Sequence, residues 1–363
     1  MMKFSTRQNF RDGMALIMVM IAITVFTILA AALWFSMKVE THLAQRSDHE
    51  QQLLWLGRSG VEYARWILSQ QASIAGEPYD SLNQIWAGGP GGADETNSVL
   101  AGISLDNYPI GEGTVSIKII DRERFVNINT ANAQELQQVL TLMGVDADSI
   151  SVVADSILDW VDTDDSPRLA GAESDYYQSL TPPYYAKNAP IDDLSELLLV
   201  KGVTPEMYYG GSATNSSAPQ RPQNPKLGFG NAPGQTPVYP FGLKDIFTPI
   251  SSGRININTA DTNVLQIIPG MDAQSAASIV LQRAGPDGVD GTEDDTPFRS
   301  INQLVTAGVA PQLVQQLGNL CNVRSTVFEV HINAQIGDSQ REFIALLFRN
   351  SGTDIQTLGF YWK

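Results

Sequence analysis

The sequence predicts an α+β fold: a long N-terminal helix precedes an antiparallel sheet that a large helical insertion interrupts. Three observations predict it. They are an uncharged apolar run at Met14–Phe35, two copies of an Asn-Ile-Asn-Thr-Ala motif, and alternating polar and apolar segments on both sides of these copies. Strands repeat every two residues and helices every 3.6, so the patterns can be separated in sequence.

The apolar run predicts a helix that crosses a membrane. About 20 apolar residues span the core of a bilayer as a helix, and Thr24 and Thr27 are the only polar residues of this run. A secretory signal peptide would have a shorter apolar core and a small-residue cleavage site after it. Residues 38–68 contain no proline and keep apolar residues near helical spacing. The helix should therefore continue to about Leu68, with an amphipathic outer half.

Charge sets the expected orientation and excludes some partners. Lys3, Arg7 and Arg11 precede the apolar run, and acidic residues dominate after it. The positive-inside rule then places the N-terminus in the cytoplasm and the C-terminal domain outside it. The formal net charge of −16 disfavours nucleic acid and suits hard cations. Cys321 is the single cysteine, so no intrachain disulfide is possible.

An internal repeat organises the middle of the chain. Val126–Ala131 recurs as Ile255–Ala260, and a basic residue precedes each copy. Each copy is followed by a helical pattern, a turn glycine (Gly144 or Gly270) and a second helical pattern. The order resembles helix-hairpin-helix or SAM-like units, which predicts two related helical modules.

Strand patterns flank the two modules. Thr114–Ile120 precedes them, and Val327–Ile332, Glu342–Phe348 and Thr357–Trp362 follow them. The order is natural if the helical block is inserted into one sheet domain. The predicted segments are a leader (1–13), the N-terminal helix (14–70), the first part of the sheet domain (71–125), module 1 (126–211), a Pro/Gly-rich linker or loop (212–253), module 2 (254–320) and the C-terminal strands (321–363).

The start of the chain resembles a type IV prepilin. A basic leader ends at Gly13, and Met14 opens the apolar run. In that family a membrane peptidase cuts after the glycine, so the resemblance implies cleavage between Gly13 and Met14 by a prepilin peptidase. Most pilins carry a glutamate at the fifth mature position, where this chain has Met18. Among the pseudopilins of type II secretion, the lack of this glutamate is similar to the K-type minor subunit.

The leader, both modules and the segment Asp159–Tyr177 together resemble the K-type minor pseudopilins of type II secretion. This resemblance implies a pilin-like sheet domain, a position at the pseudopilus tip, I-type and J-type minor pseudopilins as partners, and a role in protein export across the outer membrane. It also implies a single-pass protein of the bacterial inner membrane with a periplasmic C-terminal domain. Two alternatives stay open: a membrane-anchored helix-hairpin-helix receptor for DNA uptake, which should present a basic face, and a minor pilin of a type IV pilus.

Two acidic clusters are candidate calcium sites, because calcium takes about 6 to 8 oxygen ligands. The alternative for each is a solvated acidic loop, and the second cluster lacks the glutamate that ends an EF-hand loop. Some members of the resembled family bind calcium in the globular region. The three histidines are scattered and Cys321 has no evident activating partner, so we expect no enzyme activity. The first cluster contains Asp159, Asp162, Asp164, Asp165, Glu173 and Asp175; the second contains Asp287, Asp290, Glu293, Asp294 and Asp295.

Overall fold

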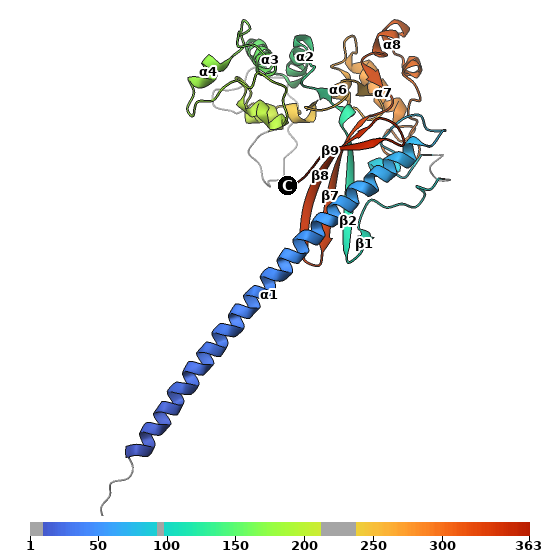
Figure 1. Ribbon diagram of the computed structural model, residues 1–363. Coiled ribbons are helices and arrows are strands. Elements are labelled where there is room, and N and C mark those ends of the chain that lie inside the picture. The colour runs from blue at the N-terminus through green and yellow to red at the C-terminus, as the bar shows by residue number, and fades with distance from the viewer. Residues whose placement is uncertain (1–9, 93–97, 212–236) are drawn as a thin grey trace, which may run out of the picture.

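One long helix extends away from the rest of the molecule. The computed structural model describes residues 10–92, 98–211 and 237–363 (Figure 1). Helix α1 runs from Phe10 to Ala72, and its first half projects into open space. The segment Met14–Thr41 is long and apolar enough to cross a membrane, and its apolar window is not buried against the rest of the chain. The predicted N-terminal apolar helix is therefore confirmed.

The second half of α1 packs across an antiparallel sheet. Leu53 and other apolar residues of this half are buried against the sheet. Two glycines allow the helix to lie close to the strands. A Cβ atom at Gly57 would lie 2.6 Å from the Phe343 ring, and one at Gly60 would lie 2.6 Å from the Ile332 side chain. Larger residues at these positions would push the helix away from the sheet.

The sheet has five antiparallel strands in the order β1-β2-β7-β8-β9. Strands β2 and β7 pair directly, although residues 122–326 separate them in sequence. The whole helical block is therefore inserted between two neighbouring strands, as predicted. All four predicted strands are present, whereas the short strand β1 was missed. The strands are β1 (Tyr108–Ile110), β2 (Gly113–Asp121), β7 (Val327–Ile336), β8 (Ser339–Arg349) and β9 (Ile355–Trp362).

A parallel pair of two-residue strands joins the beginning of module 1 to a segment far along the chain. Strand β3 (Val126–Asn127) pairs with β4 (Phe247–Thr248). Residues 237–253 therefore pack with module 1, although composition placed them in the linker 212–253. The rest of that linker lies outside the described residues. The α-helices of module 1 are α2 (Ala133–Met143), α3 (Ala147–Val161), α4 (Ser174–Gln178) and α5 (Pro205–Tyr209).

A second pair of the same kind joins the beginning of module 2 to the segment that follows it. Strand β5 (Ile255–Asn256) pairs in parallel with β6 (Cys321–Asn322). Gly144 and Gly270 occupy matching turns and both adopt left-handed backbone conformations, with φ of 81° and 82°. The α-helices of module 2 are α6 (Thr262–Leu265), α7 (Ala273–Arg283) and α8 (Pro311–Leu317).

The second asparagine of each motif explains why the motif recurs. The Asn129 side chain accepts a hydrogen bond from Ile191 N at 2.7 Å and donates to Ile191 O at 2.9 Å. The Asn258 side chain makes the same pair of bonds with the backbone of Phe298, both at 2.9 Å. Each asparagine thus fastens a distant segment of its own module, because an amide can donate and accept at once.

Candidate functional site

The structure brings together three members of the first acidic cluster. Asp159 lies in the last turn of α3, Asp162 caps the end of that helix, and Glu173 caps the start of α4. One carboxylate oxygen from each lies within 4.8 Å of the other two. Asp159 and Glu173 are buried, and Asp162 is half-buried. Two helix ends therefore converge their carboxylates on one point.

One arginine is hydrogen-bonded within this group. The Arg168 guanidinium donates from Nη1 to Asp159 Oδ1 at 2.6 Å and to Asp162 Oδ2 at 2.5 Å. The buried Oδ1 of Asp162 and both buried oxygens of Glu173 receive no hydrogen bond from the described residues. One positive charge therefore faces three carboxylates, and three buried acceptor atoms are left without a donor.

The environment of Glu173 disfavours its charged form. Burial, and then the neighbouring carboxylates of Asp159 and Asp162, raise the pKa of Glu173 to about 7. A bound cation would reverse this effect, because it stabilises the carboxylate form. Glu173 is 3% exposed, so solvent does not supply the missing partners.

A glycine leaves the space that this arrangement needs. A Cβ atom at Gly171 would lie 1.9 Å from Asp159 Oδ2. The backbone N–H of Ala170 donates to Asp155 Oδ2 at 3.1 Å, so Asp155 holds the same loop. Asp155 and Arg168 were not identified from the sequence. The spacing of Asp155 and Asp159 on one helix face was the available signal.

The remaining members of the first cluster serve the surrounding loop. Asp165 Oδ1 accepts from Ser174 N at 3.2 Å, which places Asp165 against the start of α4. Asp164 Oδ1 accepts from Ser166 N at 2.9 Å and forms a local turn. Asp175 is exposed on α4 and does not belong to the converging group.

The second acidic cluster lies in the loop after α7 and has its own cation. The buried guanidinium of Arg283 forms two hydrogen bonds with Asp290, Nε to Oδ1 at 2.9 Å and Nη2 to Oδ2 at 2.6 Å. Its Nη1 donates to Ile257 O and Ala260 O at 2.7 and 2.8 Å. Asp290 therefore connects the acidic loop to the motif of module 2, a role that spacing in sequence does not indicate.

Backbone donors satisfy much of the rest of this loop. Asp294 Oδ2 accepts from Asp287 N at 2.9 Å, and Asp295 Oδ2 accepts from Gly291 N at 2.8 Å. Glu293 is exposed. The five acids are thus spread around the loop and partly neutralised by protein donors.

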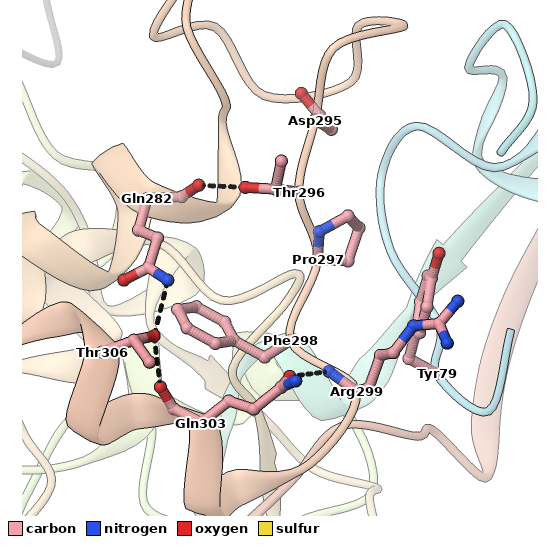
Figure 2. Close-up of a pocket in the computed structure, with 9 residues that line it drawn as sticks. All are labelled: Tyr79, Gln282, Asp295, Thr296, Pro297, Phe298, Arg299, Gln303 and Thr306. Atoms are coloured by element: carbon pink, nitrogen blue, oxygen red, sulfur yellow. Dashed lines mark hydrogen bonds between the residues drawn. The ribbon is translucent and has the colours of Figure 1, made fainter. Parts of the chain in front are cut away.

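Asp295 also borders a cleft of about 380 Å³ beside module 2 (Figure 2). Figure 2 shows a chain of hydrogen bonds along one wall of this cleft. Thr296 Oγ1 donates to Gln282 O at 2.5 Å, Gln282 Nε2 donates to Thr306 Oγ1 at 2.7 Å, and Thr306 Oγ1 donates to Gln303 O at 2.6 Å. These polar groups already bond to one another, and the described residues that line the cleft do not form a cluster of acid, base and nucleophile.

A buried polar network joins the insertion to the sheet. Asp121, at the end of β2, accepts hydrogen bonds from Thr259 Oγ1 at 2.5 Å, Ser325 Oγ at 2.6 Å and Asn256 Nδ2 at 3.2 Å. Thr259 and Asn256 belong to the motif of module 2, and Ser325 precedes β7. Burial raises the pKa of Asp121. This network sets where module 2 sits relative to the sheet.

A buried ion pair completes the same junction. Arg349, at the end of β8, pairs with Asp80 in the loop after α1, and both side chains are buried. Arg349 Nη2 also donates to Ser325 O at 2.6 Å, and Ser325 N donates to Asp80 Oδ2 at 2.8 Å. The helix–sheet core and the core of the two modules therefore meet at a set of polar groups that depend on one another.

Comparison with known proteins points to one family. Residues 117–210 match the family model described as "Type II secretion system (T2SS), protein K". Type II secretion system protein K of Pseudomonas aeruginosa is 24% identical and aligns with 96% of this chain and 92% of its own length. A putative type II secretion system protein K of Escherichia coli K12 is 25% identical over 55% of this chain and 60% of its own length.

A solved structure shares the fold. A chain in the crystal structure of the GspK–GspI–GspJ complex, from the type 2 secretion system of enterotoxigenic Escherichia coli, superposes with a TM-score of 0.60. It is 20% identical, and the match covers 88% of this chain and 99% of that one. The family model, the relatives and the fold agree, and the resemblance of this chain to type II secretion system protein K is confirmed.

Proposed function

We propose that this chain is a minor pseudopilin at the tip of the type II secretion pseudopilus, where it assembles with I-type and J-type minor pseudopilins to support protein export across the outer membrane. The observation that carries the proposal is the fold that this chain shares with a member of the GspK–GspI–GspJ complex. The match covers 88% of this chain. In this chain an apolar helix comes first, and a helical block is then inserted between the strands of a sheet. The role is structural, with no catalytic step.

The arrangement of the elements suits a subunit at an end of a filament. The apolar half of α1 anchors the chain in the bacterial inner membrane, with the C-terminal domain in the periplasm. The inserted modules lie at the end of the molecule opposite the apolar half of α1 (Figure 1). A pseudopilin stacked above would meet this block. Most pilins use a glutamate at the position of Met18 to pair with the N-terminus of a neighbouring subunit. A subunit with no neighbour above it does not need this glutamate.

The two modules resemble helix-hairpin-helix units, but their turns do not suit DNA. Asp146 and Asp272 are the N-cap residues of α3 and α7, two residues after the turn glycines. Asp272 Oδ1 accepts from Ser275 N at 2.7 Å. This bond occupies an N–H group at the start of α7 that a phosphate would need as a donor. Carboxylates at these positions repel phosphate, so we interpret the modules as packing units for protein contacts rather than as a DNA-uptake receptor.

We also propose that Asp159, Asp162 and Glu173 hold a calcium ion. Their converging oxygens, the buried unpaired atoms of Glu173 and the space at Gly171 fit a hard cation that prefers carboxylates. The ion would fix the end of α3 to the start of α4. The second cluster is the weaker candidate, because among the described residues its acids do not converge on one point. Backbone N–H groups also already donate to Asp294 and Asp295.

Processing of the leader gives a direct prediction. Prepilin peptidase should cut between Gly13 and Met14, because a basic leader ends in glycine at the start of the apolar run. N-terminal sequencing of the membrane-extracted protein should read Met-Ala-Leu-Ile, and Gly13→Arg should leave the leader attached. An intact leader on the wild-type protein, in cells with active prepilin peptidase, would contradict the pseudopilin assignment.

A further inference from the structure

Two short segments of the chain attach the helical insertion to the sheet, and one carboxyl group joins them. The entering segment is the 3₁₀-helix η3 (Arg122–Arg124), directly after β2, and Thr326 ends the returning segment directly before β7. Glu123 Oε1 accepts hydrogen bonds from the Thr326 backbone N–H at 3.0 Å and from the Thr326 hydroxyl. Ser252, in the connection between the two modules, is close enough to affect the pKa of Glu123. Glu123 therefore lies where the sheet and both modules meet.

The Glu123 carboxyl group is buried without a charged partner. Glu123 is 0% exposed, and its second oxygen, Oε2, receives no hydrogen bond from the described residues. Within the described part of the chain, no lysine or arginine forms an ion pair with it. A buried carboxylate without a cation is unfavourable, so the site favours the protonated acid. The charged groups of neighbouring elements have other partners: Arg122 pairs with Glu329, Arg349 with Asp80 and Arg283 with Asp290, Arg324 donates to Ala72 O, and Arg124 lies against the Phe125 ring.

Asp121 adds to this preference. This residue lies at the end of β2, two positions before Glu123, and it is also buried. Asp121 accepts hydrogen bonds from Thr259, Ser325 and Asn256, and Glu123 N donates to its Oδ1 at 2.8 Å. Glu123 Oε2 has no such donor, so Glu123 is the less well satisfied of the two acids. Burial, and then the neighbouring carboxylate of Asp121, raise the pKa of Glu123 to about 7.

We infer that Glu123 is a proton-controlled latch: its neutral carboxyl group keeps the insertion attached to the sheet, and its ionisation makes this junction easier to open. Ionisation places a negative charge beside Asp121 in a buried site, and the two attaching segments must separate before water can reach that charge. The position of the modules relative to the sheet then depends on pH. The latch acts in the same way whether or not the chain assembles with minor pseudopilins.

Hydrogen–deuterium exchange of the full chain in detergent, corrected for the intrinsic exchange rate at each pH, tests the latch. The folded pKa of Glu123 lies above its ordinary 4.5, so the stability that this group gives the closed junction is lost as pH rises from about 4.5 to about 7. Protection of residues 321–327 should fall by more than about tenfold between pH 5 and pH 7 and then level off. Residues 61–68 of α1, which pack on the sheet, should keep their protection. Equal protection of residues 321–327 at both pH values, or an equal fall in both regions, would overturn the inference.

A matched pair of variants assigns the response to one residue. Glutamine cannot ionise and keeps an oxygen that accepts from Thr326, so Glu123→Gln should hold the protection of residues 321–327 constant to within about threefold from pH 5 to pH 8. Glu112→Gln removes the same charge from the exposed turn between β1 and β2, and it should keep the response of the wild type. A full response in Glu123→Gln, or loss of the response in both variants, would contradict the latch.

Discussion

Replacing Arg349 by methionine should lower the free energy of unfolding by about 3–5 kcal/mol, because it leaves the buried carboxylate of Asp80 without its charge partner. The loss should extend beyond the ion pair. Arg349 also bonds Ser325 O, and Ser325 bonds Asp121. The variant should therefore loosen the attachment of module 2 to the sheet. Chemical unfolding followed by tryptophan fluorescence measures the change.

Two controls separate this effect from a general loss of charge. Arg341→Met removes a pair with the exposed Glu50 and should cost less than about 1 kcal/mol. Combining Asp80→Asn with Arg349→Met should recover part of the loss, because the amide replaces the unpaired buried charge. A cost for Arg349→Met as small as that for Arg341→Met would contradict a structural role of the junction.

Calcium should reverse the effect of Glu173→Gln on stability. The pKa of Glu173 is raised to about 7, above its ordinary 4.5. The folded state therefore favours the protonated acid, and the stability that this group contributes is lost as pH rises from about 4.5 to about 7. In chelator at pH 8, glutamine relieves the repulsion and should raise the melting temperature, by roughly 1–2 °C for each kcal/mol of repulsion removed. In millimolar calcium the variant should be the less stable protein.

The calcium response of the wild type follows from mass action. An ion that binds only the folded state stabilises it by about 2.7 kcal/mol at a hundredfold excess over its dissociation constant. Gly171→Ala should abolish this response, because its Cβ would displace Asp159. Asp294→Asn, in the second cluster, should leave it intact. Identical melting of the wild type in calcium and in chelator would contradict the site. If the calcium response were lost in Asp294→Asn but kept in Glu173→Gln, the calcium site would lie in the second acidic cluster instead.

Local patterns in the sequence were sufficient for much of the fold. The apolar run, the alternating strands and the repeated motif each lie within one short window, and they predicted α1, four strands and the insertion. The parallel pairs β3–β4 and β5–β6 are two residues long and join distant segments. No window contains both partners, so composition assigned residues 237–253 to a linker.

The candidate site shows the same limit. Asp159, Asp162 and Glu173 lie close in sequence, so their spacing indicated a common site. The loop at Asp287–Asp295 has equal acid density, but Arg283 neutralises part of it through a buried contact. Nothing in the sequence indicated the Asp80–Arg349 pair, because the two residues are 269 positions apart in the chain. Spacing identifies acids that gather locally, but it does not show which of them an arginine pairs with, as Arg168 does with Asp159 and Arg283 with Asp290.

Assembly with its partners tests the central claim most directly. The full chain would be co-expressed with the I-type and J-type minor pseudopilins of the same organism and analysed by size-exclusion chromatography in detergent, with a DNA-shift assay in parallel. The account predicts that all three proteins elute as one complex and that duplex DNA is not bound. Elution of this chain alone while the other two pair with each other, or micromolar, salt-sensitive binding to DNA, would contradict it.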